Sequence, residues 1–189
     1  MRRISATYIF PGNRPPLKYG ILSCLDDGTV MSITDTSGKL KEEQGVEYYS
    51  GVLVPGFINC HCHLELSFLK GQIPEKTGIG GFIGAINRLR NKEFPNMLKA
   101  IENAEFQLFN SGTVAVGDVV NSLITLDLKR SGKMFYHTFA ETYGFHPSRA
   151  ERAFELACMT ERKFHEYNLK ASVVPHSPYS VSEQLFKKI

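Results

Sequence analysis

The sequence has few cysteines, little net charge and no long apolar run, and each absence excludes a class of protein. The net charge is +3, and no cluster of Lys and Arg is long enough to predict binding to nucleic acid or to a membrane surface. No stretch approaches the roughly 20 apolar residues of a membrane span, and the first ten residues lack the apolar run and cleavage site of a secretory signal. The cysteines are too scattered for a disulfide scaffold; they are Cys24, Cys60, Cys62 and Cys158. We therefore expect a cytoplasmic protein with reduced thiols and no nucleic-acid or membrane partner.

Residues 1–52 show a pattern of short strands separated by turns. The expected strands are Ile4–Phe10, Tyr19–Leu25 and Thr29–Thr34, and each is followed by a cluster of turn-forming residues. Turn signals at this spacing are typical of antiparallel β structure. Nothing in the segment suggests catalysis, so we expect residues 1–52 to be a β domain and residues 53–189 to be a second domain.

Residues 53–189 alternate between strands and helices. The expected strands are Val52–Asn59, Thr113–Val120, Met134–Ala140 and Lys170–Pro175. Apolar residues at helical spacing lie between them, and two capping boxes predict helix starts, at Ser148 with Glu151 and at Ser180 with Glu183. About four β/α units in succession indicate a parallel sheet. A closed (β/α)8 barrel needs about 250 residues, so the expected fold class is α/β with an incomplete TIM-type barrel.

Two histidines near the end of the first barrel strand are the best candidates for chemistry. Side chains alternate across a strand, so His61 and His63 should point to the same side. Two neutral imidazoles one pleat apart can bind a single divalent metal ion, with zinc the expected ion. The position supports this reading, because active sites of parallel β/α folds form at the C-terminal ends of the strands. The alternative is a pair of exposed or hydrogen-bonded histidines. Cys60 and Cys62 fall on the opposite face and are expected to be small buried apolar residues.

Three acidic residues also follow or end predicted strands. Glu65 and Glu141 are candidates for substrate-recognition carboxylates because each comes soon after a strand end. The alternative for both is a solvated loop acid. For Asp118 we expect a structural role, capping the next segment.

The residues around the histidine pair resemble a known signature. Val54–His63 reads Val-Pro-Gly-Phe-Ile-Asn-Cys-His-Cys-His, which is similar to the first-strand signature of the amidohydrolase superfamily. Val174–Ser182, with Pro175-His176-Ser177-Pro178-Tyr179, resembles a segment of the nucleoside and s-triazine deaminase–chlorohydrolase branch, and Gly112–Asp118 also fits that branch. The resemblance covers the whole chain in the order of the family.

The resemblance implies a role for each matched residue. His61 and His63 would be metal ligands, and His176 would contact the substrate, the alternative being a capped surface histidine. The family also has an N-terminal β-sandwich, of which residues 1–52 would be part. Its remaining metal ligands, and the Glu and Asp that transfer protons, lie on later barrel strands. We therefore expect no catalytic general base within the chain and place it beyond Ile189.

The implied activity is hydrolytic deamination of an aminopurine-like or other heterocyclic small molecule by a metal-activated water, with dechlorination or amide hydrolysis as related options. The first rival is a non-catalytic half-barrel that serves binding or interaction. The second is a metal-independent phosphate-binding β/α protein, which is disfavoured because no glycine-rich loop directly follows a strand. Half a barrel would leave open strand edges, so we also expect a homo-oligomer or association with the missing half of the barrel. The 189-residue chain alone is expected to be inactive.

Overall fold

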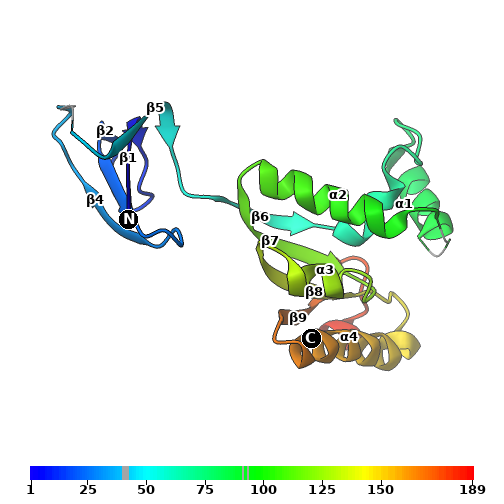
Figure 1. The fold of residues 1–189 in the computed structure, drawn as a ribbon. Helices are drawn as coiled ribbons and strands as arrows, with labels where there is room; N and C mark the ends of the chain where they lie inside the picture. The colour runs from blue at the N-terminus through cyan, green and yellow to red at the C-terminus, as the bar shows by residue number, and fades with distance from the viewer. Residues whose placement is uncertain (40–42, 91, 93) are drawn as a thin grey trace. The chain divides into compact units, whose positions relative to one another are not determined.

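The computed structural model describes residues 1–39, 43–90, 92 and 94–189 and divides into two compact units, Met1–Gly56 and Phe57–Ile189. The division falls close to the boundary expected after residue 52. The first unit is a β-sheet and the second is an α/β unit that contains a partial half-barrel sheet (Figure 1). None of the helices in the described residues is long and apolar enough to cross a membrane.

In the N-terminal unit the described strands form a five-stranded sheet in the order β2-β1-β3-β4, with β5 paired to β1. The strands are β1 (Arg2–Ile9), β2 (Leu17–Lys18), β3 (Ile21–Cys24), β4 (Val30–Thr34) and β5 (Val46–Leu53). β1 pairs antiparallel with β2 and β3, as the turn pattern predicted, whereas β5 pairs with β1 in parallel.

The single strand expected over Val52–Asn59 is wrong. Val52 and Leu53 end β5, and a new strand, β6, begins at Phe57. Pro55 lies in the segment between them, and a proline has no N–H to donate to a strand ladder. The apolar run therefore contains the end of one sheet and the start of another.

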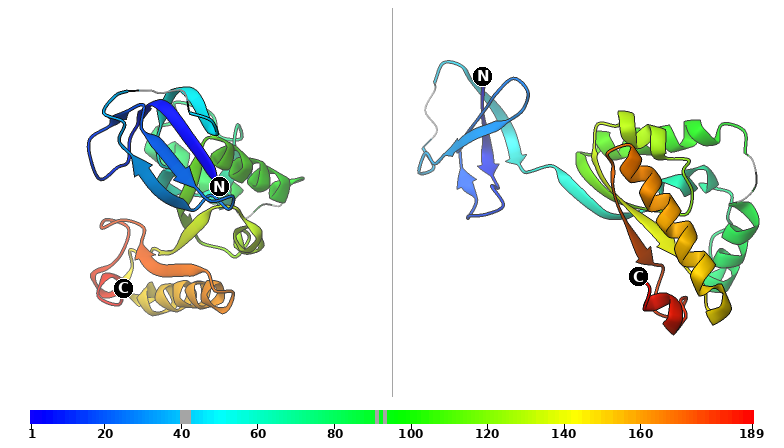
Figure 2. Two further views of the ribbon diagram at one scale, coloured as in Figure 1. Left: turned by 60° about the vertical axis from the view of Figure 1, so that its left-hand side comes forward. Right: turned by 90° about the horizontal axis from the view of Figure 1, so that it is seen from below.

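The second unit holds a parallel sheet in the order β6-β7-β8-β9. Its strands are β6 (Phe57–Cys62), β7 (Thr113–Val120), β8 (Phe135–Thr142) and β9 (Lys170–Pro175). The helices that connect and follow them are η1 (Leu64–Leu69, a 3-10 helix), α1 (Gly78–Leu89), α2 (Met97–Asn110), α3 (Leu126–Ser131), η2 (Pro147–Arg149, a 3-10 helix), α4 (Ala150–Glu166) and α5 (Glu183–Phe186). α2 packs on β7 and η1, and α4 runs along β8 and β9 (Figure 2).

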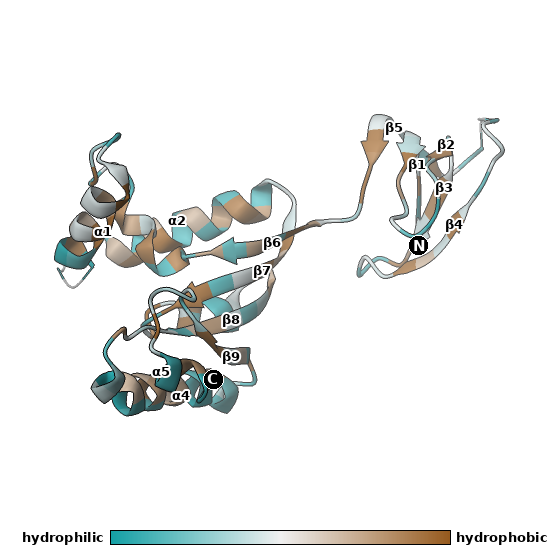
Figure 3. Cartoon of the chain, turned by 180° about the vertical axis from the view of Figure 1, so that it is seen from behind, coloured by the Kyte–Doolittle hydropathy of each residue, from teal (hydrophilic) through white to brown (hydrophobic). Residues whose placement is uncertain are grey.

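Alternation along β8 shows which face of this sheet is covered. Tyr136, Thr138 and Ala140 are buried, while Phe135 is 59% exposed. Tyr136 packs with Leu64 and other residues of η1 and α2, so the buried residues lie on the helix side. Figure 3 shows apolar colouring along β9 and many polar residues along α4. The opposite face of the strands therefore carries the partly exposed side chains, among them those of the site.

Both predicted capping boxes are wrong. Ser148 lies in η2, and α4 starts after Arg149, whose side chain makes no capping hydrogen bond. The cap of α5 is Ser182 rather than Ser180, because the Ser182 hydroxyl accepts from the Leu185 N–H at 3.2 Å. In each case the neighbouring loop sets where the helix can begin, and spacing in the sequence does not report that geometry.

Candidate active site at the ends of the parallel strands

His61 and His63 lie side by side at the C-terminal end of β6. His61 is in the strand, and His63 is the residue between the strand and η1. Their ring centroids are 5.1 Å apart and the rings meet edge to face at 71°. Two imidazoles that bind one tetrahedral zinc ion at about 2.0–2.1 Å would have ring centres about 5 Å apart. The spacing of the pair thus fits one shared divalent ion.

The electrostatic surroundings of His63 favour the form that binds metals. Burial lowers the pKa of His63, and the nearby charge of Glu141 opposes this effect without cancelling it. The ring is therefore biased toward the neutral imidazole, whose nitrogen lone pair is free to bind a cation. Within the described residues no group of three or more His, Cys, Asp or Glu is placed to hold a metal ion. If both histidines bind an ion, they would supply half of a tetrahedral set.

His176, the residue that directly follows β9, and Glu141 of β8 form a second pair. The His176 Nδ1 lies 2.6 Å from Glu141 Oε1, and the His176 backbone N–H donates to the carbonyl oxygen of Thr142 at 2.9 Å. The Glu141 side chain is 8% exposed and the His176 side chain 45% exposed. With Nδ1–H donated to the carboxylate, Nε2 is the ring nitrogen left for another partner. Two residues predicted separately as substrate contacts are thus joined in one unit.

The two pairs share one end of the sheet. β6, β8 and β9 run parallel, so the C-terminal ends of all three strands lie at the same end of the sheet. The charge of Glu141 raises the pKa of His63 against the larger lowering by burial, as expected for groups that lie near one another. The sheet therefore brings His61, His63, Glu141 and His176 to a common rim.

Glu65 occupies a different environment from the one predicted for a substrate contact. Its side chain is 4% exposed, and both oxygens have donors within the protein. Oε1 accepts from the Asn121 N–H at 3.1 Å and lies 3.4 Å from the Arg90 guanidinium, while Oε2 accepts from the Ser122 hydroxyl at 2.7 Å. The carboxylate holds loops together and presents no free acceptor to the rim.

Sequence reasoning missed a buried ion pair beneath the histidines. Asp118 Oδ2 lies 2.6 Å from Lys129 Nζ, and neither side chain is exposed. Asp118 Oδ1 accepts from the Leu64 N–H at 2.8 Å, so this residue has the structural role expected for it but caps η1. Lys129 carried no signal in the sequence, since a lysine on a short helix is ordinarily solvated.

The two cysteines beside the histidines differ from each other. Cys62 is half-buried against the Leu64 and Val116 core, and burial, with the charge of Asp118, raises its pKa to about 11. Cys60 is exposed, so the expectation that both cysteines are buried is wrong for Cys60. The reason is that β6 lies at an edge of the sheet, with a neighbour on one side only in the described residues.

Comparison with known proteins gives one sequence relative and several structural ones. No protein-family model matches the sequence. The chain is 30% identical over 139 residues to an adenosine deaminase of Helicobacter pylori (strain ATCC 700392 / 26695), a match that covers 73% of this chain and 34% of the relative.

The structural matches cover nearly the whole chain. The crystal structure of Helicobacter pylori aminofutalosine deaminase with methylthio-coformycin has a TM-score of 0.75 at 23% identity and covers 98% of this chain and 46% of that one. Guanine deaminase from C. acetobutylicum with bound guanine has a TM-score of 0.67 at 12% identity, with 97% and 48% covered. The chain thus spans about a third to a half of the length of these relatives. The deaminase relative and the shared fold together confirm the resemblance of this chain to the amidohydrolase superfamily.

Proposed function

We propose that this chain contributes the metal pair and the substrate contacts of a hydrolytic deaminase that acts on an aminopurine-like or other heterocyclic small molecule. The observation that carries the proposal is that the His61–His63 pair and the Glu141–His176 pair both lie at the C-terminal ends of strands in one parallel sheet. The names of the relatives support the reaction class, since the adenosine, aminofutalosine and guanine deaminases all release an amino group from a ring.

His61 and His63 would hold a divalent ion, for which we propose zinc. Nitrogen ligands at this spacing suit zinc, whose catalytic sites use three protein ligands and keep one position open. Such an ion supplies an activated water near neutral pH. The remaining ligands, and the groups that transfer protons, are not assigned within residues 1–189.

His176 would hold the substrate ring, with Glu141 acting through it. The carboxylate accepts the Nδ1 proton and so sets the orientation and tautomer of the imidazole. Nε2 can then bind a ring nitrogen or an exocyclic group next to the ion. In the net reaction, the ring carbon gains oxygen from water and its bond to the amino nitrogen breaks, releasing ammonia.

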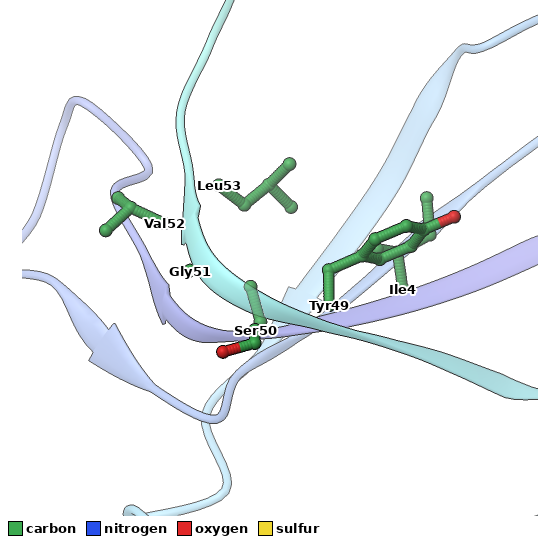
Figure 4. A pocket seen from close by; sticks show the side chains of 7 residues that line it. Ile4, Tyr49, Ser50, Gly51, Val52 and Leu53 are labelled. Carbon is green, nitrogen blue, oxygen red and sulfur yellow. The ribbon is translucent and has the colours of Figure 1, made fainter.

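The finer architecture and setting are part of the same proposal. We infer that the half-barrel is four β/α units of a (β/α)8 barrel and that the N-terminal sheet is part of a β-sandwich. An apolar groove of about 270 Å³, lined by Ile4, Tyr49 and Leu53 among others, supports the second point, since a further layer would cover it (Figure 4).

Partly exposed apolar strand residues such as Ile58 and Phe135 support pairing with another copy or with a chain that completes the barrel. Four unpaired cysteines support a reducing, cytoplasmic setting.

The test is zinc binding and zinc-dependent ammonia release from adenosine and related aminopurine nucleosides by the intact protein that supplies the remaining ligands, with solution mass measured in parallel. His61→Ala and His63→Ala should remove zinc binding and activity together. His176→Ala should reduce turnover strongly while zinc content stays near that of the unmodified protein. His146→Ala is the matched control, because the His146 side chain bonds only to Ser148 in an exposed loop among the described contacts. Zinc binding that survives His63→Ala would contradict the proposal.

A further inference from the structure

The three residues His63-Leu64-Glu65 are held from two sides by buried carboxylates. Leu64 is 1% exposed, and its N–H donates to Asp118 Oδ1 at 2.8 Å. Glu65 comes next and binds the loop after β7 through Asn121 and Ser122. The residue immediately before this anchored pair is His63, whose ring lies beside that of His61. The backbone on its C-terminal side thus has little freedom.

Asp118 is itself fixed by the layer of helices. Lys129 of α3 pairs with Asp118 Oδ2 and donates to Thr138 Oγ1 of β8 at 3.0 Å. The ammonium also lies 4.9 Å from the ring centre of Phe164. All four residues are buried. Asp118 is therefore fixed in place with Oδ1 facing the Leu64 N–H, at the point where β6 ends and η1 begins.

Glu65 connects the same segment to the second pair of the site. Arg90, the C-cap residue of α1, lies 3.4 Å from Glu65 Oε1 and donates to Asn121 Oδ1 at 2.5 Å. Asn121 Nδ2 in turn donates to the backbone oxygen of Glu141 at 3.1 Å. The chain of bonds runs from the residue after Leu64 to the residue that binds His176.

We propose that Asp118 and Glu65 are positioning residues that fix His63 for metal binding and set its distance from Glu141. The inference rests on the proposed function, in which His63 is a metal ligand. It assigns Glu65 a role other than the substrate contact that its place in the sequence suggested, because its oxygens are already occupied inside the protein.

The physical reason is preorganisation of a ligand by the shell around it. Outer-shell partners of metal ligands typically change metal affinity about 10- to 100-fold when they are mutated. Here the partners act on the backbone next to the ligand and not on its ring, so we expect a loss of about tenfold, at the lower end of that range.

Two double variants isolate the hydrogen bond to Leu64. Asp118→Asn with Lys129→Met removes the buried charges but keeps an oxygen for the Leu64 N–H. Asp118→Ala with Lys129→Met removes the charges and that oxygen. Measured in the full chain by competition with a chromophoric chelator, zinc affinity should stay within about twofold in the first variant and fall about tenfold in the second.

Three controls keep the outcome interpretable. Tyr136→Phe removes a 3.0 Å bond to Glu105 in the same core, so it should lower the melting temperature without changing zinc affinity. If the alanine double variant does not fold, Glu65→Gln and Glu65→Ala replace it, with the larger loss expected for alanine. Equal zinc affinity in both double variants, together with zinc binding lost in His63→Ala, would overturn only the positioning role of Asp118 and Glu65. Zinc binding kept in His63→Ala would overturn both the metal site and that positioning role.

Discussion

The two units differ in where they place their charges. In the N-terminal sheet, Arg2 pairs with Glu47 at 2.7 Å, and the two side chains are 52% and 42% exposed. In the half-barrel, Lys129 pairs with Asp118 at a similar distance, and both are fully buried. Exposed pairs contribute little to stability, whereas removing one partner of a buried pair leaves an uncompensated charge. In the half-barrel the buried pair therefore fixes a backbone group, the Leu64 N–H, whereas in the N-terminal sheet the pair lies at the surface.

The units differ in their cores as well. The fully buried large side chains are Phe164, Leu64, Ile101 and Leu185, all in the half-barrel. In the described part of the N-terminal unit the buried side chains are small or few, with Ala6, Ile9 and Cys24 among them. The candidate site residues thus belong to the unit with the better-packed core, and such a core holds side chains more rigidly.

The largest difference between the units should appear when one cation is removed from each. Lys129→Met leaves Asp118 buried without its partner and should lower the free energy of unfolding by about 3–5 kcal/mol. Arg2→Met in the N-terminal sheet should lower it by less than about 1 kcal/mol. Urea unfolding of both variants measures this. A loss well under about 1 kcal/mol for Lys129→Met would show that the pair is no more important than a surface one.

A second comparison concerns activity. Glu141→Gln should lower kcat/KM by about tenfold, because His176 Nδ1 then donates to a neutral amide oxygen, which accepts a weaker hydrogen bond than the charged carboxylate does. The matched change in the N-terminal unit is Tyr49→Phe, which removes a 3.1 Å bond to Glu47 and should leave kcat/KM unaltered. Steady-state kinetics of the active protein decide the point, and equal effects of the two changes would contradict the division of labour.

Thiol labelling sharpens the comparison at the level of single residues. Cys60 is exposed and should react with iodoacetamide at pH 8 without added metal. Cys62, with a pKa raised to about 11, should react slowly at pH 8 and faster as the pH approaches that value, since the thiolate is the reactive form. The buried Cys24 of the N-terminal sheet serves as the protected reference. Peptide mass spectrometry reads the labels, and Cys62 labelled as fast as Cys60 would be the contrary result.

The smallest expected effect is the acid response of the N-terminal sheet. The hydrogen bond from Arg2 lowers the pKa of Glu47 from 4.5 to about 2. A carboxyl with a lowered folded-state pKa stabilises the fold above pH 4.5, and this contribution disappears as the pH falls from 4.5 toward 2. Glu47→Gln should therefore flatten the pH dependence of the melting temperature in that interval, while Glu43→Gln, at the neighbouring Arg3 pair, tests whether the response is specific to Glu47.

Much of the half-barrel could be predicted because its local signals agree with one another. The strand expected at Thr113–Val120 has those bounds in the structure, since a β-rich run there is bounded by a Gly turn and polar residues. The place of His61 and His63 on one side of a strand end followed from alternation alone. The helix starts failed because an N-cap depends on how the preceding loop arrives, and Ser148 was absorbed into a 3-10 turn.

Periodicity and short motifs are local properties of the chain, so they could be read without a structure. They predicted the order of strands and helices, the pairing of His61 with His63 and the resemblance to amidohydrolases. Only the tertiary structure decided the partners of the acidic residues. Glu65 and Glu141 look alike in sequence, yet one is enclosed by Arg90, Asn121 and Ser122 and the other faces His176. Asp118 and Lys129 meet because β7 and α3 pack together, and a buried charge is stable only beside a partner that the fold brings to it.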